Sequence, residues 1–162
     1  MVKLKNNIRI LKNNKSIINC TIFICIIIID QLSKFLLIRK NIQIIPNLLK
    51  FTYLENNGAA FGIFNTNIVL ISNLLIVIVL LVYWIKSEKN NTKNISLTLI
   101  IAGSIGNLVD RVVRGYVIDF IKIWDNIPIF NIADISIVIG LIILLMLNIY
   151  NIMQKKEISK IV

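Results

Sequence analysis

Residues 68–85 read IVLISNLLIVIVLLVYWI, and only Ser72 and Asn73 interrupt the apolar side chains before the aromatic pair near the end. A helix of about 20 mainly apolar residues crosses the hydrocarbon core of a bilayer. A run of this length without any charge predicts a transmembrane helix. The rest of the chain must therefore be interpreted with a membrane as its solvent.

Three further apolar segments accompany it, over about 16–38, 95–111 and 131–150. The chain has 162 residues, 57% of them hydrophobic, and its mean hydropathy is +0.81. That is more apolar surface than one small water-soluble core buries. We expect residues 1–162 to form a single integral membrane domain of the all-α class with four transmembrane helices.

The first segment looks like a secretory signal peptide, because five cations precede it within residues 3–15. No small-residue cleavage site follows, however, and the apolar run continues beyond Asp30. We therefore expect this segment to be retained as a helix.

Charge predicts how the helices are oriented. If they alternate from a cytoplasmic N-terminus, eleven cations and two acids lie on the cytoplasmic side, and seven cations and six acids lie outside. Lys and Arg concentrate on the cytoplasmic side of membrane proteins. The pattern predicts that both termini are cytoplasmic (N-in, C-in), and it explains the net charge of +10 without nucleic-acid binding.

Two outer segments then connect the helices. In residues 41–67, the turn signal Pro46-Asn47 precedes the β-branched and aromatic run 51–54, which predicts a short strand or hairpin. Residues 112–130 mix apolar side chains with charges, which predicts an amphipathic segment lying on the membrane surface.

The chain contains few kinds of side chain that could perform catalysis. The chain has no histidine, which excludes Ser-His and Cys-His catalysis and histidine metal sites. Cys20 and Cys25 lie five apart in one apolar segment, so we expect neither a disulfide nor a metal cluster. Ser33 and Lys34 are adjacent, and neighbouring residues of a helix do not face each other, which disfavours a Ser-Lys nucleophile. Carboxylates remain.

Four carboxylates are expected at one depth of the membrane. The outer ends of the first and third helices and the outer start of the fourth lie together in this threading, and the acids at that depth are Asp30, Asp110, Asp119 and Asp134. A charge inside the hydrocarbon boundary costs roughly 2.5 to 3.5 kcal/mol, so it marks a function or a buried pairing. Two close carboxylates share one proton, so one of them can activate water while the other polarises a peptide carbonyl.

Structural roles fit some of the same residues. Asp110 beside Arg111 predicts an ion pair at a helix end. Asp134 suits the positive dipole end of the fourth helix, with Asn131 as its N-cap. Asp125 and Glu55 are expected to be solvated loop charges.

The third helix carries small and amide side chains that also have a structural explanation. Gly103, Ser104 and Gly106 suit close helix packing. Asn107 lies three residues before Asp110, on the same helix face, and is expected to hydrogen-bond to another helix.

Two non-enzymatic functions remain open on the residues alone. A transporter or channel would use Asp30, Asp110 and Asp134 as a proton path. Such a path should continue to the cytoplasmic side, yet nearly all of residues 68–85 and the second half of 131–150 are apolar. A structural scaffold would use the acids for assembly only.

Four motifs occur in order at the expected outer helix ends. They are Asp30-Gln31-Leu32-Ser33-Lys34; Asn56-Asn57-Gly58-Ala59-Ala60-Phe61; Gly106-Asn107-Leu108-Val109-Asp110-Arg111, continuing to Gly115-Tyr116-Val117-Ile118-Asp119-Phe120; and Phe130-Asn131-Ile132-Ala133-Asp134. In this order the chain resembles the lipoprotein signal peptidases, the type II signal peptidases of bacteria, over residues 16–150.

The resemblance implies a hydrolase of the bacterial cytoplasmic (inner) membrane. It would be an aspartic endopeptidase that removes the signal peptide from prolipoproteins just before the diacylglyceryl-modified cysteine, with its site toward the extracytoplasmic face. It implies Asp119 and Asp134 as the catalytic pair, no metal or cofactor, and no nucleic-acid partner. Residues implied to support the site or bind substrate are Asp30, Lys34, Asn56, Gly58, Asn107, Asp110, Arg111 and Asn131.

The resemblance also implies a fold for the outer segments and two kinds of partner besides the substrate. The first outer segment would form a small β-cradle, and the second would carry a surface helix. Membrane lipids would surround the protein, and the cyclic peptide globomycin would inhibit it.

Overall fold

The computed structural model describes residues 2–58, 66–86 and 90–161, and the side chains of residues 16–58, 67–86 and 90–158 within them. Residues 59–61 of the second motif, and Glu88 and Lys89 of the cytoplasmic charge pattern, lie outside this part of the chain. The described elements follow the order α1 (Val2–Leu37), β1 (Asn41–Ile45), β2 (Leu49–Asn56), α2 (Thr66–Lys86), α3 (Asn91–Arg114), β3 (Val117–Ile123) and α4 (Ile132–Ile161).

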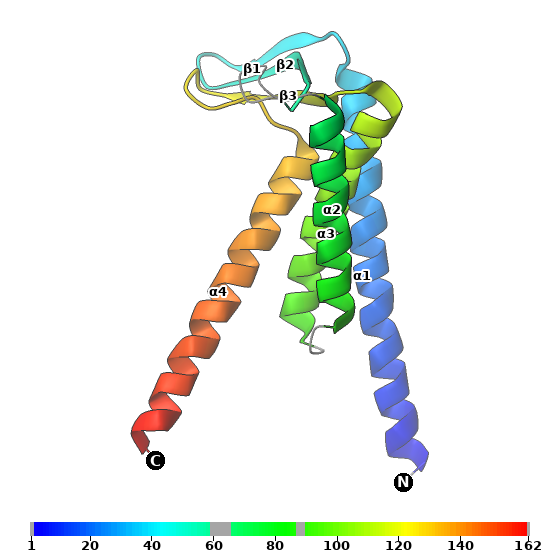
Figure 1. Ribbon diagram of the computed structural model, residues 1–162, viewed down its shortest axis with the longest axis vertical. Helices are drawn as coiled ribbons and strands as arrows, with labels where there is room; N and C mark the ends of the chain where they lie inside the picture. The colour runs from blue at the N-terminus through cyan, green and yellow to red at the C-terminus, as the bar shows by residue number, and fades with distance from the viewer. Residues whose placement is uncertain (1, 59–65, 87–89, 162) are drawn as a thin grey trace.

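All four described helices are long and apolar enough to cross a membrane, as the sequence predicts. The candidate spans are Ser16–Leu37, Asn67–Lys86, Asn91–Arg114 and Ile132–Ile158. The sheet lies at one end of the helices, and both chain termini lie at the opposite end (Figure 1). This arrangement places the two termini on the same side of the bundle.

The least apolar span lies at the centre of the bundle. α3 has a mean hydropathy of 1.4, and 56% of its most apolar window is buried, against 6%, 11% and 17% for the other three spans. Helices α1, α2 and α4 all contact it. Polar side chains on α3 are therefore shielded from lipid by protein, whereas the other helices expose mostly apolar side chains, as a bilayer requires.

Small residues allow α3 to approach α4 closely. A Cβ added to Gly103 would lie 2.3 Å from the carbonyl oxygen of Ala133 and 2.8 Å from Ile137 Cγ1. The two backbones are thus in contact at this level, and Ser96 and Ser136 add hydrogen bonds of 2.8 Å to backbone carbonyls across the same interface. The expected role of Gly103 in helix packing agrees with this geometry.

The predicted hairpin is present in the first outer segment. β1 and β2 pair antiparallel, and the Leu48 N–H closes the turn by donating to the Ile45 carbonyl at 3.2 Å. Asn47 within the turn has a φ of 57°, a left-handed conformation that asparagine tolerates.

The surface helix expected within residues 112–130 is wrong. α3 ends at Gly115, which takes the left-handed C-cap conformation with a φ of 85°. The chain then enters β3, which pairs antiparallel with β2, and the sheet order is β1-β2-β3. The segment VIDFIKI is rich in β-branched side chains, and the free edge of β2 gives its backbone a hydrogen-bonding partner.

Replacing Gly103 by alanine is expected to weaken the α3–α4 contact, because its new methyl group has no space beside Ala133. Overpacking of this kind costs about 1–3 kcal/mol. Thermal unfolding of the purified protein in detergent should show a lower midpoint. Ser104→Ala, at the next position of the same helix, is the matched control, and equal midpoints for the two variants would contradict the close approach.

Candidate active site

Three fully buried charges join α1 to α3 just below the sheet. Lys34 Nζ lies 2.8 Å from Asp30 Oδ2 and 2.9 Å from Asp110 Oδ2, and all three side chains have 0% exposure. Asp30 and Lys34 are four residues apart on one helix face, so they meet without any backbone distortion. Gly106 makes room for the cluster, since a Cβ there would lie 2.8 Å from Asp30 Oδ2.

Backbone groups from two further elements complete the cluster. The Ala133 N–H at the start of α4 donates to Asp30 Oδ1 at 2.9 Å. The Ile118 N–H of β3 donates to Asp110 Oδ2 at 3.1 Å. The same three charges therefore hold α1, α3, β3 and α4 in fixed relative positions.

The predicted ion pair between Asp110 and Arg111 is wrong. Asp110 pairs with Lys34 and with Arg114, which lies four residues later on α3. Neighbouring positions of a helix point about 100° apart, so Arg111 lies on another face. Its Nη1 donates to the Asn107 carbonyl at 3.3 Å.

Two asparagines connect the charge cluster to a second pair of carboxylates. Asn107 Oδ1 accepts from Lys34 Nζ and from Asn131 Nδ2, each at 3.0 Å. Asn107 Nδ2 donates to Asp134 Oδ1 at 2.7 Å, and Asn131 Nδ2 donates to Asp119 Oδ1 at 2.7 Å. Asn107 thus contacts Lys34 through its oxygen and Asp134 through its nitrogen, whereas Asn131 contacts both Asn107 and Asp119 through Nδ2.

Asp134 also takes part in the cap of α4. The Asp134 N–H donates to Asn131 Oδ1 at 2.9 Å, and the Asn131 N–H donates to Asp134 Oδ2 at 3.1 Å. This reciprocal pair is a capping box, and it confirms Asn131 as the N-cap. Asp134 lies in the first turn of α4, where the helix dipole favours a carboxylate.

Asp119 lies on β3, almost fully buried at 1% exposure. Asn56, at the end of β2, donates from Nδ2 to Asp119 Oδ2 at 2.7 Å. Burial raises the pKa of Asp119 from 3.8 to about 6; hydrogen bonds from Asn56 and Asn131 oppose the rise, and the negative charge of Asp134 adds to it. Asp134 is therefore close enough to affect the protonation of Asp119.

Arg111 and Gly58 lie beside this carboxylate pair. The Arg111 guanidinium interacts electrostatically with Asp134 and Asp119. Within the described part of the chain, its Nε is a buried side-chain atom with no hydrogen-bond partner. Gly58 has a φ of 70°, and a Cβ there would lie 2.6 Å from Val69 Cγ1 and 3.3 Å from Arg111 Nη2, so only glycine fits.

The ten predicted site residues form one connected region at the sheet end of the bundle. Asp125 lies outside it, 90% exposed and paired with Lys122, in the loop after β3, as expected. Glu55 is exposed as expected and accepts a hydrogen bond from Tyr53, but it lies on β2, so the prediction that it is a loop charge is wrong. Sequence reasoning missed two members. Gln31 donates to Asp30 and Asp110, and Arg114 pairs with Asp110. The spacing of four residues between Asp110 and Arg114 could have predicted this ion pair from the sequence.

The fold and the site define a multi-pass membrane protein with a pair of carboxylates buried at one end of its helices. A family model described as signal peptidase (SPase) II matches residues 22–150. The chain belongs to this family, the bacterial membrane proteases that cleave the signal peptides of lipoproteins.

Individual relatives agree with this assignment. The chain is 43% identical over 131 residues to a lipoprotein signal peptidase of Clostridium tetani, covering 74% of this chain and 84% of the relative. It is 35% identical over 147 residues to a lipoprotein signal peptidase of Staphylococcus aureus, covering 84% and 90%. A bacterial membrane enzyme solved by the in meso method at 2.3 Å resolution superposes with a TM-score of 0.78 at 33% identity, over 86% of this chain and 92% of that one.

Replacing Lys34 by methionine should destabilise the protein strongly, because it leaves Asp30 and Asp110 buried without the cation they share. Breaking a buried ion pair costs about 3–5 kcal/mol. The free energy of unfolding in sodium dodecyl sulfate should fall by that order. Adding Asp30→Asn to this variant removes the carboxylate left without a cation, because Asp110 keeps its ion pair with Arg114, and should restore part of the loss.

Lys122→Met is the control for this experiment, because it breaks the ion pair with exposed Asp125. Exposed pairs contribute little to stability. If the Lys34 and Lys122 variants unfold alike, the buried cluster does not have the structural role described.

Proposed function

We propose that the chain is an aspartic endopeptidase that cuts prolipoproteins just before the diacylglyceryl-modified cysteine, with Asp119 and Asp134 as its catalytic pair. One observation supports this most directly: two carboxylates interact at the sheet end, and the pKa of Asp119 is raised to about 6. Aspartates held in this way divide into a proton carrier and a base near neutral pH.

Asp119 holds the shared proton in this mechanism, and Asp134 is the base. Asp134 removes a proton from a water molecule as the water oxygen attacks the scissile carbonyl carbon. Asp119 donates its proton to the carbonyl oxygen, which gives a tetrahedral intermediate. When the C–N bond breaks, Asp134 passes its proton to the amine of the lipidated cysteine, and Asp119 recovers its proton as the signal peptide leaves with a carboxyl terminus.

The supporting residues act on this pair through contacts of known length. Asn107 orients Asp134 at 2.7 Å, and Asn131 and Asn56 orient the two oxygens of Asp119 at 2.7 Å each. Lys34, held by Asp30 and Asp110, donates to Asn107, and Asn107 in turn accepts from Asn131. Arg111 and Gly58 shape the side of the site that the substrate backbone would approach.

The site would face the extracytoplasmic side, with both termini in the cytoplasm. The charge pattern of the sequence favours this orientation, and the shared end of the two termini in Figure 1 is compatible with it. At the outer boundary, water reaches the carboxylates while the acyl chains of the substrate stay in lipid.

The transport alternative has less support. Among the described side chains, the buried ionisable ones are Asp30, Lys34, Asp110 and Asp119, and all belong to the sheet end. The buried hydroxyls Ser96 and Thr98, nearer the other end of α3, donate to backbone carbonyls. A proton path across the membrane would need further titratable groups there.

Asp119→Asn and Asp134→Asn should each lower cleavage of a lipidated precursor by about a thousandfold, because each removes one of the two proton-transfer groups. The assay is gel mobility of the precursor in detergent. Asp125→Asn, six residues after Asp119, removes an exposed carboxylate and should cleave like the parent protein. Full cleavage by the Asp119→Asn or the Asp134→Asn variant would contradict the proposal that these two residues are the catalytic pair.

The pH profile of kcat/KM tests which carboxylate holds the proton. With the pKa of Asp119 at about 6, kcat/KM should decline above that pH, because Asp119 loses the proton that it donates. Asn56 stabilises the charged form of Asp119, so Asn56→Leu should raise this pKa and move the decline to higher pH, by about one unit for a lost hydrogen bond to a charged group.

Thr52→Val, on the same strand, serves as the control, because Thr52 bonds to Asn41 away from the site. Its profile should match that of the parent protein. A decline that stays in place or moves to lower pH in the Asn56 variant would show that Asp119 is not the group titrating there.

A further inference from the structure

A polar pocket lies at the tip of the sheet, separate from the carboxylate site. It opens between the β1–β2 turn and the loop that follows β3, and its volume is about 240 Å³. The polar side chains lining it are Gln43, Asn47, Lys50, Lys122 and Asp125, and Trp124 lies beside them. None of these residues takes part in the hydrogen-bond network around Asp119 and Asp134.

The backbone holds the two sides of this pocket together. The Trp124 N–H donates to the Leu48 carbonyl at 3.2 Å, which ties the loop to the turn. Lys50 and Lys122 are direct partners in the β2–β3 register, so their side chains project from the same face of the sheet. Two like charges opposite each other are unfavourable unless an anion lies between them.

Among the described residues, Asp125 is the one carboxylate that interacts with these two cations. Asp125 Oδ1 lies 2.9 Å from Lys122 Nζ, and its side chain is 90% exposed. Within the described residues, no carboxylate lies within 4.0 Å of Lys50 Nζ. The pocket therefore keeps a positive charge, and the amides of Gln43 and Asn47 offer further hydrogen-bond donors. Ammonium groups with amide donors suit a phosphate group.

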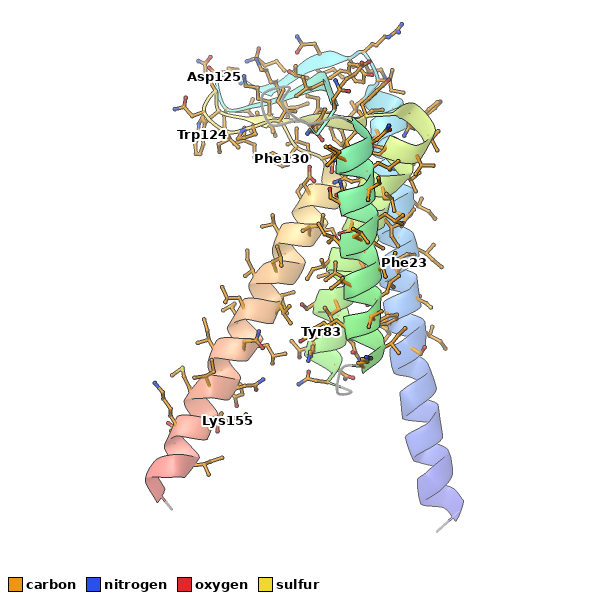
Figure 2. All side chains as sticks on the ribbon, viewed as in Figure 1. Phe23, Tyr83, Trp124, Asp125, Phe130 and Lys155 are labelled. Atoms are coloured by element: carbon orange, nitrogen blue, oxygen red, sulfur yellow. The ribbon has the colours of Figure 1, made fainter. Side chains whose placement is uncertain are left out.

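Exposed apolar side chains occur at the same end of the sheet, and Ile45, Leu48 and Trp124 among them line the pocket. Those at the tip are Ile44, Ile45, Leu48, Trp124 and Ile127, with exposed fractions from 38% to 59%. Figure 2 shows Trp124 and Asp125 at the edge of the sheet that lies on the side of α4, with Trp124 nearer to the level of the helix ends. Tryptophan and isoleucine beside lysine are typical of a surface that lies in the lipid headgroup region.

We propose that this pocket binds the phosphate of an anionic phospholipid in the leaflet on the sheet side, with Lys50 and Lys122 as its cationic ligands. The apolar rim enters the boundary between headgroups and acyl chains, and Trp124 lies at that boundary. The bound lipid fixes the tip of the sheet on the membrane. This assignment does not depend on which carboxylates perform cleavage.

Trp124 gives a direct reading of occupancy. The chain has two tryptophans, so Trp84→Phe leaves Trp124 as the only one. The full-length variant, purified in a neutral detergent, is titrated with short-chain phosphatidylglycerol, with short-chain phosphatidylcholine, and with inorganic phosphate. We expect a saturable change in Trp124 emission with phosphatidylglycerol, at least fivefold weaker binding of phosphatidylcholine, and no response to inorganic phosphate in the same range.

Three substitutions in the Trp84→Phe protein assign the charges. Lys50→Gln should weaken phosphatidylglycerol binding roughly fivefold, as expected for one lysine at an anionic lipid surface. Asp125→Asn removes the competing carboxylate and should tighten binding. Lys40→Gln is the matched control, because it removes the same charge just before β1, at the end of that strand away from the turn, and should change binding less than twofold.

The outcomes are distinct. Weakening by Lys50→Gln with tightening by Asp125→Asn supports the site, and the opposite sign of the two effects cannot come from misfolding. Equal weakening by Lys50→Gln and Lys40→Gln would show bulk electrostatic attraction and overturn it. An equal response to inorganic phosphate would show a free-anion site and overturn the lipid assignment.

Discussion

The position of Lys34 between Asp30 and Asp110 is the constraint on which the rest of the molecule depends. A buried charge without a partner costs several kcal/mol. The helices that carry these three side chains must therefore pack so that the three charges stay in contact. The two carboxylates also accept from the Ala133 N–H of α4 and the Ile118 N–H of β3. One cluster thereby determines how three helices and a strand meet.

The chemistry of the proposed site depends on that cluster through two amides. Asn107 accepts from Lys34 and donates to Asp134, and Asn131 donates from Nδ2 to both Asn107 and Asp119. Amides held by several hydrogen bonds have little freedom, so Asp119 and Asp134 are held in place before any substrate arrives. Preorganisation of this kind lowers the reorganisation needed during reaction.

The sequence predicted those features that depend on local composition. Uncharged runs such as residues 68–85 identify the spans, because a bilayer accepts few other segments. The gathering of Asp30, Asp110, Asp119 and Asp134 followed from threading the helices, since it needs only membrane depth. The assignment of roles within that gathering rested on the family resemblance and stays a proposal.

The features that sequence reasoning missed depend on distant partners. Residues 117–123 form a strand because β2 offers its edge, and nothing within residues 112–130 reveals that edge. Asp110 pairs with Arg114 and not with Arg111 because residues four apart lie on the same face of a helix. The motif Asp110-Arg111 suggests the other pair because the two residues are adjacent in the sequence. Both errors come from judging a segment by its neighbours in sequence.

β3 connects the carboxylate pair with the polar pocket at the tip of the sheet. Asp119 lies near its start, and Lys122 lies near its end, one residue before the strand finishes at Ile123. Residues three apart on a strand are separated by only about 10 Å, and β3 pairs with β2 at both Asp119 and Lys122, with a register shift between Phe51 and Leu54. A lipid phosphate bound at Lys122 would therefore set the depth of Asp119 relative to the headgroups. A peptidase that cuts beside a lipid-modified cysteine needs such a reference, because its scissile bond lies at a depth fixed by the acyl chains of the substrate.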